Sequence, residues 1–304
     1  MDAEILKFDP TPGLPEDLGH GVRRVLAPNP SPMTFRGTNT YLVGQGDIAV
    51  IDPGPDDPAH LQAILAVLRP GEWISHILVT HAHLDHSPLA RPLADHTGAP
   101  ILAFGDAFSG RSAVMQDLAE RGLAGGGEGV DAGFTPDQRL AHGDRVQVGD
   151  VTLTALHTPG HFGNHLAFAM GDICFTGDLV MGWASSLVSP PDGDLTDFMA
   201  SCRMLRDGDW TVFHAGHGAP IETPLDRLDW LIAHRETREA EILAALADGP
   251  ARAFDLATRI YTETPPALIG AATRNVFAHL VDLTGRKLTA PEQTLESDAV
   301  FRRL

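Results

Sequence analysis

Residues 80–86 constrain this chain most: they read Thr-His-Ala-His-Leu-Asp-His and follow directly on an apolar, β-branched segment at 74–79. Because side chains alternate along an extended chain, His81 and His83 point the same way. The chain must then turn, so Asp85 and His86 can face a second point in space, and Asp85 can also open the next helix. Packing alone does not explain four ligand-type side chains so close together. The run predicts a strand end that carries metal ligands.

Three further ligand-type residues each follow a predicted strand. They are His161 in Thr-Pro-Gly-His, Asp178 in Thr-Gly-Asp and His217 in Ala-Gly-His-Gly. A glycine beside each lets the backbone approach closely at these turns. Imidazole and carboxylate in these proportions suit zinc and similar borderline ions. The pattern predicts one metal centre assembled from several strand ends.

The motifs THAHLDH, TPGH, TGD and AGHG resemble, in order and spacing, those of the metallo-β-lactamase superfamily over about residues 35–220. The resemblance implies an α/β fold, a four-layer αβ/βα sandwich with two divalent ions at one edge. Zinc is expected first, with iron or manganese as alternatives. Carried over by position, the resemblance puts His81, His83 and His161 on one ion and Asp85, His86 and His217 on the other, with Asp178 bridging. Asp52, in Ile-Asp-Pro-Gly, matches a motif whose acid supports the ligands from behind; a simple turn role is the alternative.

Such a centre implies hydrolysis by a metal-bridging hydroxide. Two ions roughly 3.5–4 Å apart lower the pKa of the shared hydroxide and stabilise the oxyanion formed when it attacks carbon or phosphorus. Asp85 and Asp178 are therefore the expected catalytic residues. The leaving group needs a proton, for which Asp85 acting through water, or His165, are candidates. A bridging Asp178 is typical of the glyoxalase-II-like, lactonase and nuclease branches, so β-lactam hydrolysis ranks low.

A closer resemblance covers the whole chain. Residues 37–43 (GTNTYLV) and 234–239 (HRETRE) look similar to segments of the beta-lactamase-like protein 2 family. Its animal members are described as single-strand endoribonucleases, its bacterial relatives mostly as hydrolases. The family also carries a winged-helix-like C-terminal domain.

The residues themselves predict the same division. Strands are expected at 41–43, 48–51, 74–79, 101–104, 151–156, 166–169, 173–175 and 211–213, and helices at 57–68, 112–120 and 194–205, which suggests two sheets covered by helices. Helices at 228–246, 253–260 and 268–283, then a hairpin at 285–304, follow the order of a winged-helix module. We expect a catalytic domain at 1–227 and a small helical, winged-helix-like domain at 228–304; a helical cap is the alternative.

Charge bears on the substrate. The chain has a net charge of −18, and residues 1–229 hold 13 Lys and Arg against 30 Asp and Glu. An acidic domain opposes long-range capture of RNA, although bound cations reverse the sign locally. We therefore rank a small thioester, ester or lactone first and single-stranded RNA second, with a non-catalytic metal-binding protein third. The loop 182–195 follows Asp178, so Trp183, Ser185, Ser186 and Asp194 are candidates to line the substrate site; a purely structural loop is the alternative.

Localisation follows from what the sequence lacks. No apolar run approaches the roughly 20 residues that span a bilayer, and Met1–Glu4 is acidic without a signal pattern. Cys174 and Cys202 form no disulfide framework. We expect a cytoplasmic protein with no membrane contact, a small-molecule substrate or RNA as ligand, and self-association into a homo-oligomer as an open alternative. A glycine-rich surface loop is expected at 122–133.

Overall fold

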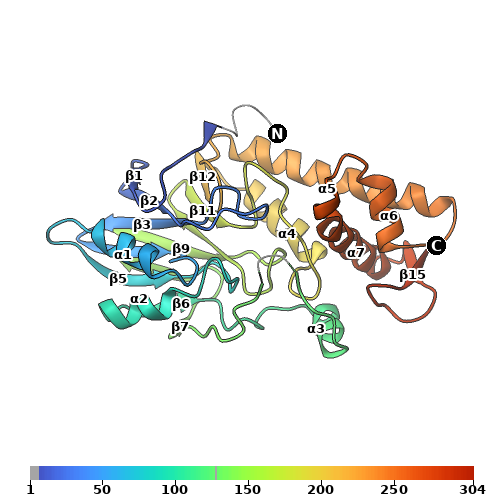
Figure 1. Ribbon diagram of the computed structural model, residues 1–304, viewed down its shortest axis with the longest axis horizontal. Helices are drawn as coiled ribbons and strands as arrows, with labels where there is room; N and C mark the ends of the chain where they lie inside the picture. The colour runs from blue at the N-terminus through green and yellow to red at the C-terminus, as the bar shows by residue number, and fades with distance from the viewer. Residues whose placement is uncertain (1–6, 127–128) are drawn as a thin grey trace.

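The computed structural model describes residues 7–126 and 129–304. The acidic N-terminus at 1–4 and residues 127–128 of the predicted glycine-rich loop lie outside the described residues. In Figure 1 the sheets occupy one end of the molecule, and helices α5, α6 and α7 form the other end.

The first sheet has seven strands whose order in the sheet is their order in the chain. The pairs from β1 to β4 are antiparallel and those from β4 to β7 are parallel. The strands are β1 (Pro15–Asp17), β2 (Val22–Leu26), β3 (Asn39–Gln45), β4 (Asp47–Ile51), β5 (Trp73–Leu78), β6 (Ile101–Ala103) and β7 (Gln138–Arg139).

The second sheet has five strands in the order β12-β11-β10-β9-β8. Only the β11–β12 pair is parallel. Its strands are β8 (Arg145–Val148), β9 (Val151–His157), β10 (Leu166–Met170), β11 (Ile173–Gly177) and β12 (Val212–Ala215).

Three apolar clusters join these sheets and their helices into four layers. One lies between the sheets and includes Val43 of β3 and Phe168 of β10. A second packs α1 (Pro58–Ala66) and α2 (Ala90–Thr97) on the first sheet. A third packs α4 (Leu195–Arg206) and α5 (Pro224–Ala247) on the second, with Cys174 and Cys202 buried and free in it. The αβ/βα sandwich is confirmed.

Strand β2 was not predicted, because two charged residues interrupt its apolar pattern. Arg23 and Arg24 are 4% and 2% exposed. Arg23 donates to Glu72 and to the carbonyl of Val67, both at 2.9 Å, which compensates for its burial. Arg24 pairs with Glu16 of the neighbouring strand. Pairing across the fold therefore permits a buried strand that hydrophobic periodicity does not reveal.

The C-terminal part contains three helices and a small sheet. α5, α6 (Ala253–Ile260) and α7 (Ile269–Gly285) follow one another, and a three-stranded antiparallel sheet has the order β13-β15-β14. Its strands are β13 (Ala251–Arg252), β14 (Thr289–Pro291) and β15 (Val300–Arg303). Because α5 begins at Pro224, the expected boundary at 228 falls one turn inside this helix.

The C-terminal helices share two cores with the rest of the chain. Leu228 and Leu231 of α5 belong to the cluster that contains Phe198 of α4. Met115 and Leu118 of α3 (Ala113–Glu120) belong to the cluster built around α6 and α7. Within the described residues, no helix is both long and apolar enough to cross a bilayer.

Deleting residues from Leu228 onward is expected to make the protein insoluble or change its oligomeric state. The deletion exposes the apolar faces of α3 and α4 that these cores cover. Size-exclusion chromatography of the truncated chain, with the full chain alongside, measures the effect. A soluble, monomeric and fully active truncation would show that the C-terminal part is an independent appendage.

Candidate metal centre

The seven predicted ligand residues come together in two adjacent buried clusters. His81, His83 and His161 form one, and the other consists of Asp85, His86, Asp178 and His217. Within each cluster, the potential ligand atoms all lie within 4.8 Å of one another. The donors come from the ends of strands in both sheets, as the sequence predicted.

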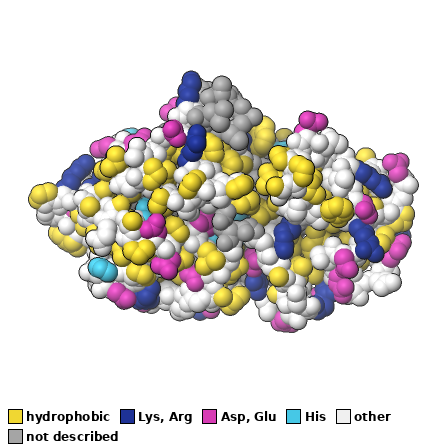
Figure 2. All heavy atoms as spheres, in the orientation of Figure 1, with side chains coloured by type: hydrophobic (Ala, Val, Ile, Leu, Met, Phe, Trp, Pro, Cys, Tyr) yellow, Lys and Arg dark blue, Asp and Glu magenta, His cyan; other side chains and the backbone are white. Residues whose placement is uncertain are grey.

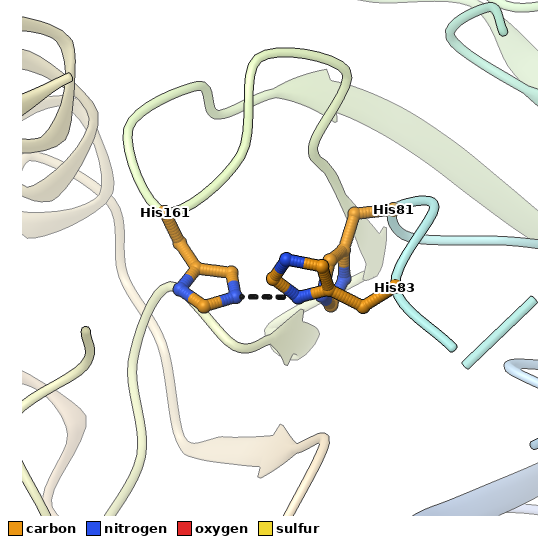
Figure 3. A group of neighbouring side chains, drawn as sticks. All are labelled: His81, His83 and His161. Atoms are coloured by element: carbon orange, nitrogen blue, oxygen red, sulfur yellow. Dashed lines mark hydrogen bonds between the residues drawn. The ribbon is translucent and has the colours of Figure 1, made fainter. Parts of the chain in front are cut away.

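The histidine cluster directs three ring nitrogens at one point (Figure 3). His83 Nδ1 lies 2.9 Å from His81 Nε2 and 3.1 Å from His161 Nε2. Burial lowers the pKa of all three imidazoles, that of His83 to about 3 and that of His81 well below its usual value. Neutral imidazole is the form that binds metals. Three converging neutral imidazoles match one face of a zinc-type coordination sphere.

Outer hydrogen bonds fix which nitrogen each ring presents. The Nδ1 of His161 lies 2.7 Å from the carbonyl oxygen of Leu187, which can only accept, so this nitrogen carries the proton. His217 Nδ1 likewise donates to the carbonyl of Gly37 at 3.0 Å. Both rings therefore turn an unprotonated Nε2 to the centre when neutral, as the second partner of a metal-binding histidine usually ensures.

The second cluster mixes carboxylates and imidazoles at close range. His217 Nε2 lies 3.1 Å from Asp85 Oδ2 and 3.3 Å from Asp178 Oδ2. His86 Nε2 lies 3.4 Å from Asp85 Oδ2 and 3.6 Å from Asp178 Oδ1. Burial lowers the pKa of His217, but Asp178 and Asp85 outweigh it and raise that pKa to about 10. The same balance raises the pKa of His86 well above its usual value. The carboxylates thus attract positive charge to this point.

Unpaired polar atoms provide a test of whether a cation fits here. Asp85 Oδ1, Asp178 Oδ1 and His86 Nε2 are buried and make no hydrogen bond to the described residues. Unpaired buried carboxylate oxygens are costly and call for a compensating partner. A divalent cation among these oxygens and nitrogens would satisfy all three, so the donor set fits a second ion.

Asp178 belongs to the second cluster and also faces the first. Its Oδ2 is 3.8 Å from His161 Nε2 of the histidine cluster and 3.3 Å from His217 Nε2 of the other. Its backbone N–H donates to His165 Nε2 at 3.2 Å. His165 Nδ1 lies 2.8 Å from Thr158 Oγ1. Both ring nitrogens of His165 are therefore engaged, Nε2 by the backbone of Asp178 and Nδ1 by Thr158.

Asp52 supports the centre from behind. Its Oδ2 lies 2.9 Å from His86 Nδ1 and accepts from Thr80 Oγ1 at 2.7 Å, while its Oδ1 accepts from the Thr80 N–H at 2.7 Å. Asp52 also follows directly on β4 and has a left-handed φ of 51°. Asp52 thus has both of the roles considered for it: it forms the turn after the strand and it supports His86.

Glycines give the ligand turns their room. A Cβ on Gly216 would lie 2.3 Å from Asp178 Oδ1, so a side chain there would displace the carboxylate. Gly160 has a φ of 139°, and its Cβ would lie 2.2 Å from the Cα of Phe198. Close approach of the Asp178 carboxylate explains the glycine before His217, and close approach of two backbone segments explains the glycine before His161.

Two cavities adjoin the centre. A narrow one of about 30 Å³ is lined by five of the ligands and by Met33, Met181 and Leu187. A larger one of about 440 Å³ is lined by residues that include Phe35, Trp183 and Trp230. Met181 lines the narrow cavity and Gly182, the next residue, lines the larger one, which places the two side by side. The narrow cavity reaches the ligands, and the larger one has room for a substrate.

The four residues predicted to line the substrate site lie in different surroundings. Trp183 lines the larger cavity and stacks on Phe35 at 5.1 Å between ring centroids. Ser186 is buried and donates to the carbonyl of Leu179. Asp194 caps α4 by accepting from the Thr196 N–H at 2.8 Å. Ser185 is half-buried in the same loop. Trp183 alone of these four has a contact that suits substrate binding.

Several groups that shape the centre were not predicted. The carbonyls of Gly37 and Leu187 orient two ligands, but a backbone carbonyl leaves no mark on the sequence. Thr80, whose hydroxyl lies 2.9 Å from His81 Nδ1, is the first residue of the THAHLDH motif and was detectable by its position.

On the face shown in Figure 2, Lys and Arg lie scattered among Asp and Glu and form no continuous patch. The lining of the narrow cavity also contains neither Lys nor Arg.

Comparison with known proteins agrees with this geometry. The sequence model of the Metallo-beta-lactamase superfamily matches residues 33–217. The chain is 33% identical to the Beta-lactamase-like protein 2 homolog of Drosophila melanogaster, over 88% of each chain. It is 31% identical to an Atrochrysone carboxyl ACP thioesterase of Passalora fulva, over 79% of this chain and 67% of the relative. A solved Beta-lactamase domain protein from Burkholderia ambifaria shares the fold, with a TM-score of 0.80 at 22% identity over 100% of this chain and 99% of that one.

The matched region contains all seven residues of the two clusters. This chain therefore belongs to the metallo-β-lactamase superfamily and is one of its hydrolases.

Proposed function

We propose that this hydrolase cleaves a small acyl substrate, a thioester first and an ester or lactone as close alternatives, with two divalent ions. The position of Asp178 carries the proposal: a single carboxylate within 4 Å of ring nitrogens in both clusters suits a bridge between two ions. One ion would be held by His81, His83 and His161. The other would be held by Asp85, His86 and His217.

The protein's own groups prepare this site. When bound, two such ions lower the pKa of water and polarise the carbonyl under attack. The outer partners of the imidazoles fix their orientation, so the ligands need not reorganise during the reaction. Asp85 lines the narrow cavity beside the other ligands, which supports it as the group that passes a proton to the leaving group through water.

The cavities favour an acyl group over a polyanion. Met33, Met181 and Leu187 surround the ligands with apolar surface, and Phe35, Trp183 and Trp230 continue it into the larger cavity. Apolar and aromatic linings suit an acyl chain or ring. The thioesterase relative from Passalora fulva supports the same chemistry. Zinc remains the first choice of metal, since borderline ions prefer imidazole-rich sites.

We expect the specificity constant on an acyl thioester to exceed that on single-stranded RNA. The net charge of −18 opposes capture of the polyanion, whereas a neutral acyl group needs only the cavity. Side-by-side kcat/KM values for an N-acetylcysteamine thioester, a lactone and single-stranded RNA, at physiological salt, test this. His83→Ala serves as the control for contaminating enzymes. Efficient RNA cleavage that disappears in His83→Ala, without acyl hydrolysis, would identify a nuclease instead.

A further inference from the structure

The segment 179–194, between Asp178 and α4, connects the metal centre to the C-terminal helices. Most of it is buried although it forms no helix or strand. Met181 and Leu187 line the narrow cavity at the ligands. The segment is also hydrogen-bonded to α5 and α7. Both helices pack on α4, which lies between them and the sheets in Figure 1.

One backbone group in this segment sets the orientation of His161. The carbonyl oxygen of Leu187 accepts from His161 Nδ1 at 2.7 Å. His161 follows a glycine turn, and its ring has no other hydrogen-bond partner than this carbonyl and His83 Nδ1 among the described residues. The position of the Leu187 carbonyl therefore decides where His161 Nε2 points.

The peptide groups on both sides of Leu187 are held by a pair of residues from the C-terminal helices. Arg235 of α5 donates from one guanidinium nitrogen to the carbonyl of Ser186. The N–H of Val188 donates to Asn275 Oδ1 of α7 at 3.0 Å. Arg235 also donates to Asn275 Oδ1 at 3.0 Å, which joins the two holders. Arg235 and Asn275, which are hydrogen-bonded to each other, thus hold Leu187 through the peptide groups on either side of it.

Arg235 is costly to keep in this place. Its side chain is 2% exposed and lies over the ring of Phe198, 5.0 Å from the centroid. None of the ion pairs among the described residues includes it. A protein that buries a guanidinium without a carboxylate partner is less stable than the same protein with an apolar side chain of similar volume at that position. A contribution to stability therefore does not explain why an arginine occupies this position. Its several N–H donors, which reach both Ser186 and Asn275, do explain it.

We propose that Arg235 and Asn275 are positioning residues for metal binding: they hold residues 186–188 so that the Leu187 carbonyl orients His161 toward the ion shared with His81 and His83. This inference rests on the assignment of His161 as a ligand in the proposed function. It makes the C-terminal helices part of the metal centre although they contribute no ligand to it.

Metal titration of the metal-free protein tests this without relying on turnover. We expect Arg235→Gln and Asn275→Leu each to weaken Co²⁺ or Zn²⁺ binding at the histidine cluster by about 10- to 100-fold, the usual effect of losing an outer partner. Binding at the cluster of Asp85, His86 and His217 should change less. Asn275→Asp keeps an acceptor oxygen for both donors and should retain near-normal affinity.

Arg274→Gln is the matched control. Arg274 precedes Asn275 on α7 and holds the same segment at Ser189 Oγ and the Pro190 carbonyl, beyond the peptides that flank Leu187. It should leave both metal affinities unchanged. Thermal unfolding of each metal-free variant separates loss of fold from loss of orientation. If Arg235→Gln does not fold, the Asn275→Leu and Asn275→Asp pair decides the question.

A double-mutant cycle with His161→Ala completes the test. If Arg235 acts through His161, adding Arg235→Gln to His161→Ala should cause little further loss of metal affinity. Unchanged affinity in folded Arg235→Gln and Asn275→Leu, or fully additive losses in the cycle, would overturn the proposal. Because the readout is metal binding, an absence of acyl hydrolysis would count against the proposed function and leave this result intact.

Discussion

Replacing Asp178 by asparagine is expected to lower kcat/KM on an acyl thioester by roughly 10³-fold while the protein stays folded. One carboxylate faces ring nitrogens in both clusters, and the amide keeps its shape without its charge. The backbone N–H that donates to His165 is also unaffected. Loss of several kcal/mol of charge stabilisation corresponds to about this factor, at about 1.4 kcal/mol per tenfold change in rate.

Steady-state kinetics, elemental analysis and thermal unfolding together measure this effect. Asp150→Asn, a substitution at an exposed aspartate in the turn between β8 and β9, is the control for simple loss of negative charge. It should retain both activity and metal content. Near-normal turnover by a folded Asp178→Asn variant would remove the basis for a two-metal mechanism.

The ligand run at 81–86 was predictable because its geometry is local. Alternation along an extended chain fixes His81 and His83 relative to each other, whatever the rest of the fold does. Their ring nitrogens indeed lie 2.9 Å apart. His161, Asp178 and His217 stand far away in the chain, and residue spacing alone could not bring them together. Their meeting depends on two sheets packed face to face, which the motif resemblance implied and the apolar core between the sheets confirms.

The groups that orient the ligands were beyond prediction for a physical reason. Leu187 acts through its carbonyl, which every residue possesses, so its identity contains no signal. Arg235 lies in the HRETRE segment that marked the family resemblance, yet nothing local shows that it reaches the carbonyl of Ser186. Such a contact depends on how α5 packs against the 179–194 segment. One sequence is therefore enough to predict the ligands, but not the residues that hold the ligands in position.

The helices and strands of the C-terminal part were predicted more accurately than its packing against the rest of the chain. The three helices and the hairpin follow from periodicity and turn residues. Met115 and Leu118 of α3 belong to the core of these helices. The sequence does not predict this contact, because α3 is short and amphipathic and could pack on either part of the chain. The domain boundary at 228 consequently stays a proposal, and the truncation described above tests it.

Removing the metals is expected to reduce hydrolysis to the uncatalysed background, and two equivalents of zinc per chain should restore it. Prolonged dialysis against dipicolinate, followed by stepwise addition of Zn²⁺, Mn²⁺ or Fe²⁺, provides the measurement; dialysis against chelator already saturated with zinc is the control. Elemental analysis of the protein as purified should give up to two transition-metal ions per chain. Full activity with well below one ion per chain would contradict the metal centre itself.

The order of reconstitution should reflect the two donor sets. Three neutral imidazoles favour Zn²⁺, so the first equivalent should bind at His81, His83 and His161. The neighbouring cluster adds carboxylates, which harder ions such as Mn²⁺ accept more readily. Because Asp178 faces both clusters, the first ion should give little activity and the second most of it. A rate that reaches its maximum at one equivalent would mean that one cluster suffices for the chemistry. Asp178 would then serve one ion and not bridge two.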